Sequence, residues 1–214
     1  SVGGILNDLT RVGGALTLDG TLNVTTTPGG AFEPGIYRVI SYGGTLTDNG
    51  LAIGTIPSPG FFVQTSVASQ VNLVNTAGLN LTFWDGDAGP KNNGVVNGGN
   101  GTWQASPGND NWTEASGSVN APWTDGGFAV FTGAPGTVTT DASLGAIRAS
   151  GMQFAVDGYR VQGADIALVG APQSIIRVGD GSTAGAAITA TIAASLTGGT
   201  QLTKTDLGTL VLTG

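Results

Sequence analysis

Short segments of alternating apolar and polar residues are the feature that most limits how this chain can fold. Residues 16–24, 71–84 and 207–213 follow this pattern, and Gly, Asn, Asp or Pro ends most such segments. Alternation with period two is typical of strands that bury one face. The best helix candidate, residues 184–195, carries β-branched Ile and Thr that favour a strand instead. The sequence therefore predicts an all-β chain of many short strands.

The composition excludes several classes of function. The chain has no Cys and no His, so disulfides, thiol nucleophiles, Ser-His-Asp sites and zinc sites built on these residues are ruled out. Its 14 acidic residues outnumber its 7 basic ones, and the net negative charge does not favour nucleic acid or an anionic membrane surface. No apolar run is long enough for a membrane-spanning helix. We expect neither a cofactor nor a metal.

A loose internal repeat indicates how the strands are arranged. Gly-Thr-Leu occurs at residues 20–22, 44–46 and 208–210, and segments 163–170 and 207–214 are near-copies of each other. A single short coil cannot bury its apolar face, whereas stacked coils bury a continuous core. This favours a parallel solenoid. A β-sandwich and a propeller stay open as alternatives, although no hairpin signature recurs between strands of equal length.

Residues 85–127 differ from the rest, because they are dense in Gly, Asn, Ser and Asp. All four Trp residues lie in this segment or at its edge. We interpret it as a loop excursion that its own Trp residues anchor. The expected organisation is one continuous domain with N-terminal coils at residues 1–84, the excursion at 85–127 and C-terminal coils at 128–214.

Residues 202–214 carry a recognisable motif. They read LTKTDLGTLVLTG and fit the form Leu-x-Lys-x-x-x-Gly-Thr-Leu-x-Leu-x-Gly. This motif resembles the passenger-associated β-strand repeat of bacterial autotransporters. Stretches 98–104, 121–133, 150–159 and 176–181 are similar to the same passenger region. The resemblance covers residues 84–214 well and residues 16–81 more loosely.

The resemblance implies a right-handed parallel β-helix, exported through the outer membrane and displayed on, or released from, a Gram-negative cell. It implies a non-enzymatic structural or adhesive segment, internal to a longer passenger. The rest of that passenger and a C-terminal membrane barrel would then lie outside this chain. The expected partner is a host or matrix glycan or protein, with no nucleic acid and no direct insertion into a membrane.

Trp103, Trp112 and Trp123 are the best candidates for a ligand-binding site. Flat apolar rings beside Asn and Asp side chains are typical of sugar-binding surfaces. This predicts, as an alternative function, a glycan-binding module centred on these residues, and it requires exposed rings. The competing interpretation is that each Trp covers an open coil edge or anchors a long loop.

Weaker motifs suggest an enzyme or a ligand site. Residues 179–184 match G-x-G-x-x-A, but a dinucleotide site needs a helix after them. Asp85 and Asp87 open like a calcium loop, and the later positions of that loop do not match. We interpret both as ordinary turns.

Charged residues of the C-terminal half raise two further hypotheses. Arg148, Arg160 and Arg177 could line one face and bind an anionic glycan. Carboxylates such as Asp157 and Asp165 could make the chain a polysaccharide hydrolase or lyase if several faced one groove. Exposed ion pairs and capped turns are the simpler interpretation.

Overall fold

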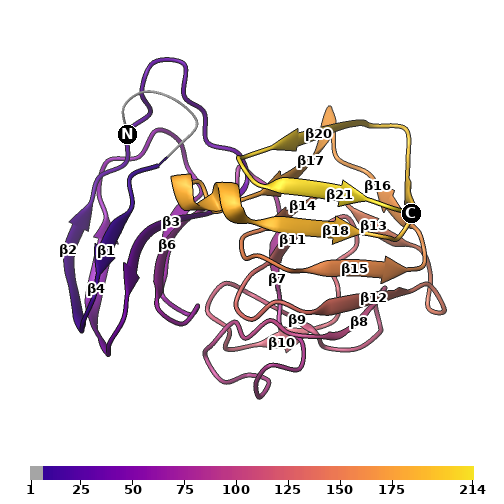
Figure 1. Ribbon diagram of the computed structural model, residues 1–214, viewed down its shortest axis with the longest axis horizontal. Coiled ribbons are helices and arrows are strands. Elements are labelled where there is room, and N and C mark those ends of the chain that lie inside the picture. The colour runs from indigo at the N-terminus through magenta and orange to yellow at the C-terminus, as the bar shows by residue number, and fades with distance from the viewer. Residues whose placement is uncertain (1–6) are drawn as a thin grey trace.

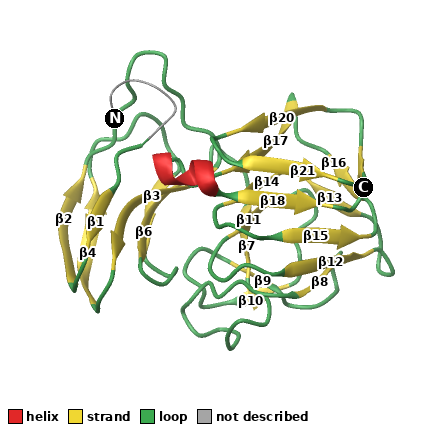
Figure 2. Ribbon diagram, viewed as in Figure 1, coloured by secondary structure: helices red, strands yellow, loops and turns green. Residues whose placement is uncertain are grey.

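The computed structural model describes residues 7–214, and nearly all of its regular structure is β-strand. Figure 1 shows two parts side by side, with the N-terminal strands on the left and a stack of later strands on the right. Figure 2 shows the one helical segment of the described residues, a 3-10 helix at Thr183–Ala187, between these parts. In residues 7–214 no helix is long and apolar enough to cross a membrane. The predicted all-β class is confirmed.

The stack begins at β7 and ends at β21. Its strands are β7 (Leu81–Trp84), β8 (Gly101–Gln104), β9 (Trp112–Thr113), β10 (Asn120–Ala121), β11 (Phe128–Phe131), β12 (Thr137–Asp141), β13 (Ile147–Ala149), β14 (Gly151–Phe154), β15 (Arg160–Gly163), β16 (Ile166–Leu168), β17 (Gln173–Val178), β18 (Thr189–Ile192), β19 (Leu196–Thr197), β20 (Gln201–Thr205) and β21 (Thr209–Leu212).

These strands form three sheets, which we call sheets I, II and III. Sheet I has the order β10-β9-β7-β11-β14-β17-β20, sheet II the order β21-β18-β15-β12-β8 and sheet III the order β13-β16-β19. The chain visits the sheets in turn, and β14 returns to sheet I beside β11, in parallel. Phe128 pairs with Gly151, and Gly151 pairs with Ile175. Each circuit therefore takes roughly two dozen residues, a length typical of structural repeats.

The main core lies between the three sheets. Strand β12 follows the alternation predicted from the sequence, with Val138 and Thr140 buried and Thr139 exposed between them. Side chains of successive circuits lie above one another inside the stack. The rings of Phe131 and Phe154, for example, stack at 4.8 Å between centroids with 7° between their planes. Aromatic stacking of this kind adds stabilisation beyond the area that is buried.

The central strands of sheet I are buried on both faces. All four residues of β11 and all four of β14 are buried. The outer-face residues Phe128 and Val130 pack with Ile36 and Val74 of the N-terminal part in a second apolar cluster. Strands covered on both sides lose the polar alternation of a half-exposed strand.

The N-terminal part consists of two smaller sheets. One has the order β1-β3-β6-β5, and the other pairs β2 with β4. Their strands are β1 (Thr10–Val12), β2 (Leu16–Leu22), β3 (Gly35–Tyr42), β4 (Leu46–Ile53), β5 (Phe61–Gln64) and β6 (Gln70–Asn75).

The strands of the N-terminal part pair in both directions. Strand β1 pairs with β3 in parallel, and β2 with β4, but β6 pairs antiparallel with both β3 and β5. The short connection at residues 65–69 explains the β5–β6 pair, because parallel neighbours need a longer crossover. Strand β7, which follows β6 in the chain, belongs to sheet I.

The Gly-Thr-Leu repeat does not predict the register in which the N-terminal strands pair. Strands β2 and β4 pair Leu16 with Leu46 and Leu22 with Ile53, so residues 20–22 do not stack on residues 44–46. The Gly-Gly corners stack instead, and Gly44 N donates to Gly14 O at 2.9 Å. A Cβ at Gly44 would lie 2.6 Å from a backbone nitrogen, so this close approach requires glycine.

The second near-repeat is also separated by the fold. Segment 163–170 contains β16 of sheet III, whereas segment 207–214 contains β21 of sheet II. Similar apolar patterns thus occupy different faces of the stack, because every strand that buries one face has the same period of two.

Candidate functional site

The three predicted ligand-binding Trp residues do meet in space, but inside the core. Trp103 lies on β8, Trp112 on β9, and Trp123 between β10 and β11. Their ring centroids are 4.6 to 5.0 Å apart. Their exposed fractions are 0%, 1% and 1%. A sugar cannot stack on these rings, so the glycan-binding hypothesis lacks the exposed surface that it requires.

The Trp residues close one end of the stack. Strand β9 pairs antiparallel with β7, and β10 pairs antiparallel with β9, at the edge of sheet I and the lower side of Figure 1. Trp84, Trp103 and Trp112 also pack against Phe131, the aromatic residue of the next circuit. Residues 85–127 therefore carry Trp103, Trp112 and Trp123, whose side chains cover this end of the stack, and we call this segment the cap. Atypical end repeats serve this purpose in stacked proteins.

Asp85 and Asp87 shape the turns of this cap. The buried Asp85 carboxylate accepts hydrogen bonds from Asn97 N and Asn120 Nδ2, both at 2.8 Å. Asp87 Oδ1 accepts from Asn100 N at 2.7 Å. These oxygens bind N–H donors of neighbouring loops, and no group of three potential metal ligands occurs within residues 7–214. The structure assigns these carboxylates a role in the cap.

Residues 179–184 hold the two parts of the molecule together. A five-residue 3-10 helix begins at Thr183, in place of the α-helix that a dinucleotide site needs. Asp180 forms an ion pair with Arg38 at 3.3 Å, and Arg38 N donates to Asp180 O at 2.9 Å. Asn7 N donates to Gly181 O. The turn thus binds the N-terminal part.

The three Arg residues do not form a ladder. Arg148 lies on β13 of sheet III, Arg160 on β15 of sheet II, and Arg177 on β17 of sheet I. Three different faces of the stack carry them, so they cannot bind one anionic chain together. Arg148 instead pairs with Asp125 at 3.4 Å, with both side chains largely exposed.

Arg177 is the centre of a buried charge cluster that the sequence did not reveal. Its side chain is 2% exposed and contacts Asp206 at 3.1 Å and Glu33 at 3.7 Å. It also donates to Pro34 O and lies 4.2 Å from the centre of the Tyr37 ring. Burial raises the pKa of Tyr37, and the Arg177 charge partly offsets this. The partners come from distant parts of the sequence, so no local motif could have indicated the cluster.

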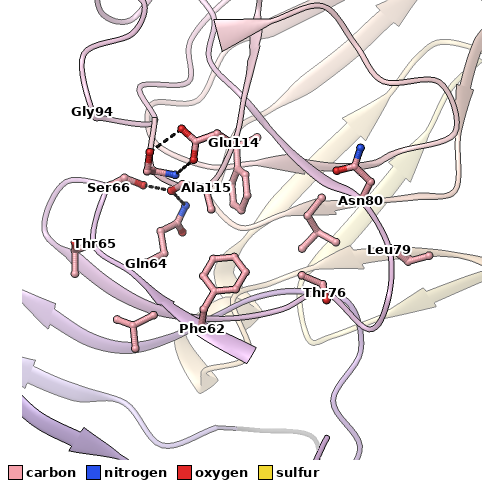
Figure 3. A pocket seen from close by; sticks show the side chains of 14 residues that line it. Phe62, Gln64, Thr65, Ser66, Thr76, Leu79, Asn80, Gly94, Glu114 and Ala115 are labelled. Carbon is pink, nitrogen blue, oxygen red and sulfur yellow. Dashed lines mark hydrogen bonds between the residues drawn. The ribbon is translucent and has the colours of Figure 1, made fainter. Parts of the chain in front are cut away.

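A groove of about 630 Å³ lies beside the junction of the two parts. Figure 3 shows Phe62 and Gln64 on one side, Leu79 and Asn80 on another, and Glu114 at the rim. Leu81 and Phe83 of β7 also line it, so its apolar surface comes from both parts. Sequence analysis did not find this groove, because its walls are far apart along the chain.

Hydrogen bonds hold the walls of the groove. Gln64 Nε2 and Ser66 Oγ both donate to Ala115 O, at 2.9 and 2.6 Å, which ties the loop at residues 114–116 to the N-terminal sheet. The Glu114 carboxylate accepts from Ser118 N and Val119 N. Partial burial acts to raise the pKa of Glu114, but hydrogen bonds from Ser116, Ser118 and Val119 lower it below its usual value. The rim therefore carries a carboxylate that is ionised at neutral pH.

The comparison with known proteins agrees with the predicted class. The chain is homologous to a segment of a bacterial adhesin autotransporter. It is 63% identical over 212 residues to the adhesin BmaC autotransporter of Brucella suis biovar 1. The aligned region covers 99% of this chain and 6% of that protein. No protein-family model and no solved structure matches the chain. The resemblance inferred from residues 202–214 and the related stretches is confirmed.

Proposed function

We propose that this chain is a non-enzymatic segment of an autotransporter passenger, displayed on the surface of a Gram-negative cell, where it supports adhesion. The observation that carries the proposal is the 63% identity to an adhesin autotransporter along 99% of the chain. Because the chain spans only 6% of that relative, the adhesive activity, the export route and the extracellular location all belong to the proposal. The proposed partner is a glycan or protein of the host or its matrix.

The architecture we propose is a right-handed parallel β-helix. Sheets I, II and III would be its three faces, residues 128–214 its coils and residues 85–127 its cap. The order in which the chain visits the sheets supports this, as do the hydrogen bonds between successive circuits. Ala155 N donates to Phe131 O, and Gly179 N donates to Phe154 O, both at 2.9 Å. Such a stack satisfies its own backbone groups and makes a stiff scaffold.

The observations favour this function over a polysaccharide hydrolase or lyase. Glycoside hydrolysis ordinarily needs two carboxylates on either side of the scissile bond. The groove contains one acidic side chain, Glu114. Asp157 accepts a hydrogen bond from Thr189 N, and Asp180 pairs with Arg38 at the junction. These carboxylates serve turns and contacts between strands.

An attachment assay tests the adhesive function. Beads coated with the purified chain are applied to epithelial cells, to immobilised matrix proteins and to a glycan array. Beads coated with an unrelated folded acidic protein are the control, since the net charge of −7 alone changes non-specific binding. We expect specific attachment to at least one of these surfaces. Attachment equal to that of the control beads on every surface would make this segment a passive spacer.

A further inference from the structure

The groove beside the junction exposes the edge of a β-sheet. The N-terminal sheet has the order β1-β3-β6-β5, so β5 has a neighbour on one side only. Residues 62–66, which belong to β5 or directly follow it, line the groove. An unpaired edge strand offers N–H and C=O groups to any extended chain that lies beside it.

The register identifies the residues that direct these groups outward. Thr76 N donates to Gly60 O, so these two residues form a hydrogen-bonded pair across β6 and β5. In an antiparallel ladder, hydrogen-bonded pairs alternate with pairs that are not hydrogen-bonded to each other. Phe62 with Val74 and Gln64 with Asn72 are therefore also hydrogen-bonded pairs. Val63, between them, therefore directs its N–H and C=O away from β6.

The groove also has the chemistry to hold side chains. Phe62, Leu79 and Leu81 provide apolar surface, and Glu114 provides a carboxylate at the rim. No Lys or Arg lines the groove. The hydrogen bonds to Ala115 O keep the opposite wall in place, so a ligand need not order it.

We propose that this groove binds an extended peptide segment of a partner protein, which adds as a strand to β5 and brings apolar side chains and a Lys or Arg near Glu114. Strand addition combines main-chain hydrogen bonds with pockets for alternate side chains, and the edge and the apolar surface of this groove provide both. The proposal rests on the proposed adhesive function, for which it names the chemistry of the partner.

A fluorescent peptide of alternating Val and Lys, roughly eight residues long, is the probe for anisotropy titrations with the purified chain. One control peptide alternates Val and Glu. A second is the Val-Lys peptide N-methylated at alternate residues, so that it cannot complete a strand pairing. We expect the Val-Lys peptide to bind more tightly than both control peptides. Added salt should lower its affinity, because salt screens the attraction between charges.

Two variants test the charge of the groove. The Asn80 side chain is exposed at the rim and makes no hydrogen bond among the described residues. Asn80→Lys adds a positive charge there, and Asn80→Ala is the matched neutral control. We expect Asn80→Lys to lower the affinity for the Val-Lys peptide about two- to fivefold relative to Asn80→Ala, which is a typical effect of one exposed charge.

A third variant tests the strand edge. Val63→Pro removes the N–H that points away from β6 and leaves the β5–β6 hydrogen bonds in place. We expect it to weaken binding roughly two- to tenfold, as the loss of one hydrogen bond does. Circular dichroism and thermal unfolding check that each variant keeps the fold.

The outcomes separate this proposal from the adhesive function. Absence of binding up to about 1 mM peptide, equal binding of the N-methylated peptide, or equal affinity of the two Asn80 variants overturns the proposed peptide site. If beads attach to cells or matrix and excess Val-Lys peptide does not reduce the attachment, adhesion stands and the groove is not its site. If the peptide binds and the beads do not attach, the adhesive function fails and the groove stands.

Discussion

At the scale of single residues, Arg177 determines how the two parts of the molecule are joined. Its guanidinium is buried between β17 and the N-terminal part, beside Asp206 and Glu33. A buried charge is tolerated only where partners and hydrogen bonds replace its hydration. Asp206 is itself 4% exposed, so it depends on Arg177 in turn.

We predict that Arg177→Ala lowers the free energy of unfolding by about 3 kcal/mol, because it leaves the buried Asp206 carboxylate without its counter-charge. Urea titration followed by circular dichroism measures this. Arg148→Ala is the control, since Arg148 is 54% exposed, and it should change the free energy by less than ~0.5 kcal/mol. Equal effects of the two substitutions would contradict the buried cluster.

At the scale of elements, the excursion works as a cap because its Trp side chains fill the end of the stack. Trp84 Nε1 donates to Gly99 O at 2.8 Å, and Trp123 Nε1 donates to Arg148 O at 3.1 Å. These bonds join the cap to the stack at two points. The loop composition predicts an excursion, whereas the direction in which its Trp rings point depends on the free end of the stack.

We predict that Trp112→Ala lowers the free energy of unfolding by about 3–5 kcal/mol, because it leaves a large cavity among packed rings. Urea titration measures the loss, and Val119→Ala, at a residue that is 60% exposed in the same cap, should have little effect. Iodide should quench the Trp fluorescence of the native chain only weakly. Strong quenching would instead indicate exposed rings and would restore the glycan-binding hypothesis.

At the scale of the whole molecule, the two ends of the stack differ. The cap covers the β7 end, whereas β20 and β21 lie at the edges of sheets I and II. Leu212 and Val211 of β21 are 51% and 36% exposed. An open strand edge with apolar side chains favours pairing with another chain.

We predict that the isolated chain self-associates through this end at high concentration, which sedimentation velocity measures. Val211→Lys should reduce the association, because edge charges oppose strand pairing. Val119→Lys adds the same charge on the cap and should leave the association unchanged. If both substitutions act alike, net charge rather than the open end controls the association.

Several features of the fold could be predicted because they depend on local sequence. Alternation in residues 207–213 predicts strand β21, which spans Thr209–Leu212. The motif at residues 202–214 indicated the resemblance to autotransporters, which the 63% identity to a segment of one such protein confirms. Each of these signals lies within one short segment, so it can be recognised without knowing which other segments pack against that segment.

The candidate site could not be predicted in the same way. The groove joins residues 62–66 to residues 79–83 and 114–116, and its open edge exists because β5 is the last strand of its sheet. The burial of Trp103 and Trp112 likewise depends on which end of the stack the cap covers. Neither fact is a property of any one segment.

The sequence by itself determined the strands, the turns that separate them, the chemistry that the chain lacks and the class of protein that it resembles. The tertiary structure decided which strands pair, so it also decided that Arg177 meets Glu33 and that Gly-Thr-Leu repeats do not stack. The physical reason is that an alternation with period two defines the two faces of a strand. It does not determine which strand pairs with it or which residues pack against each face. Only the register of the sheets and the packing of one part on the other supply these.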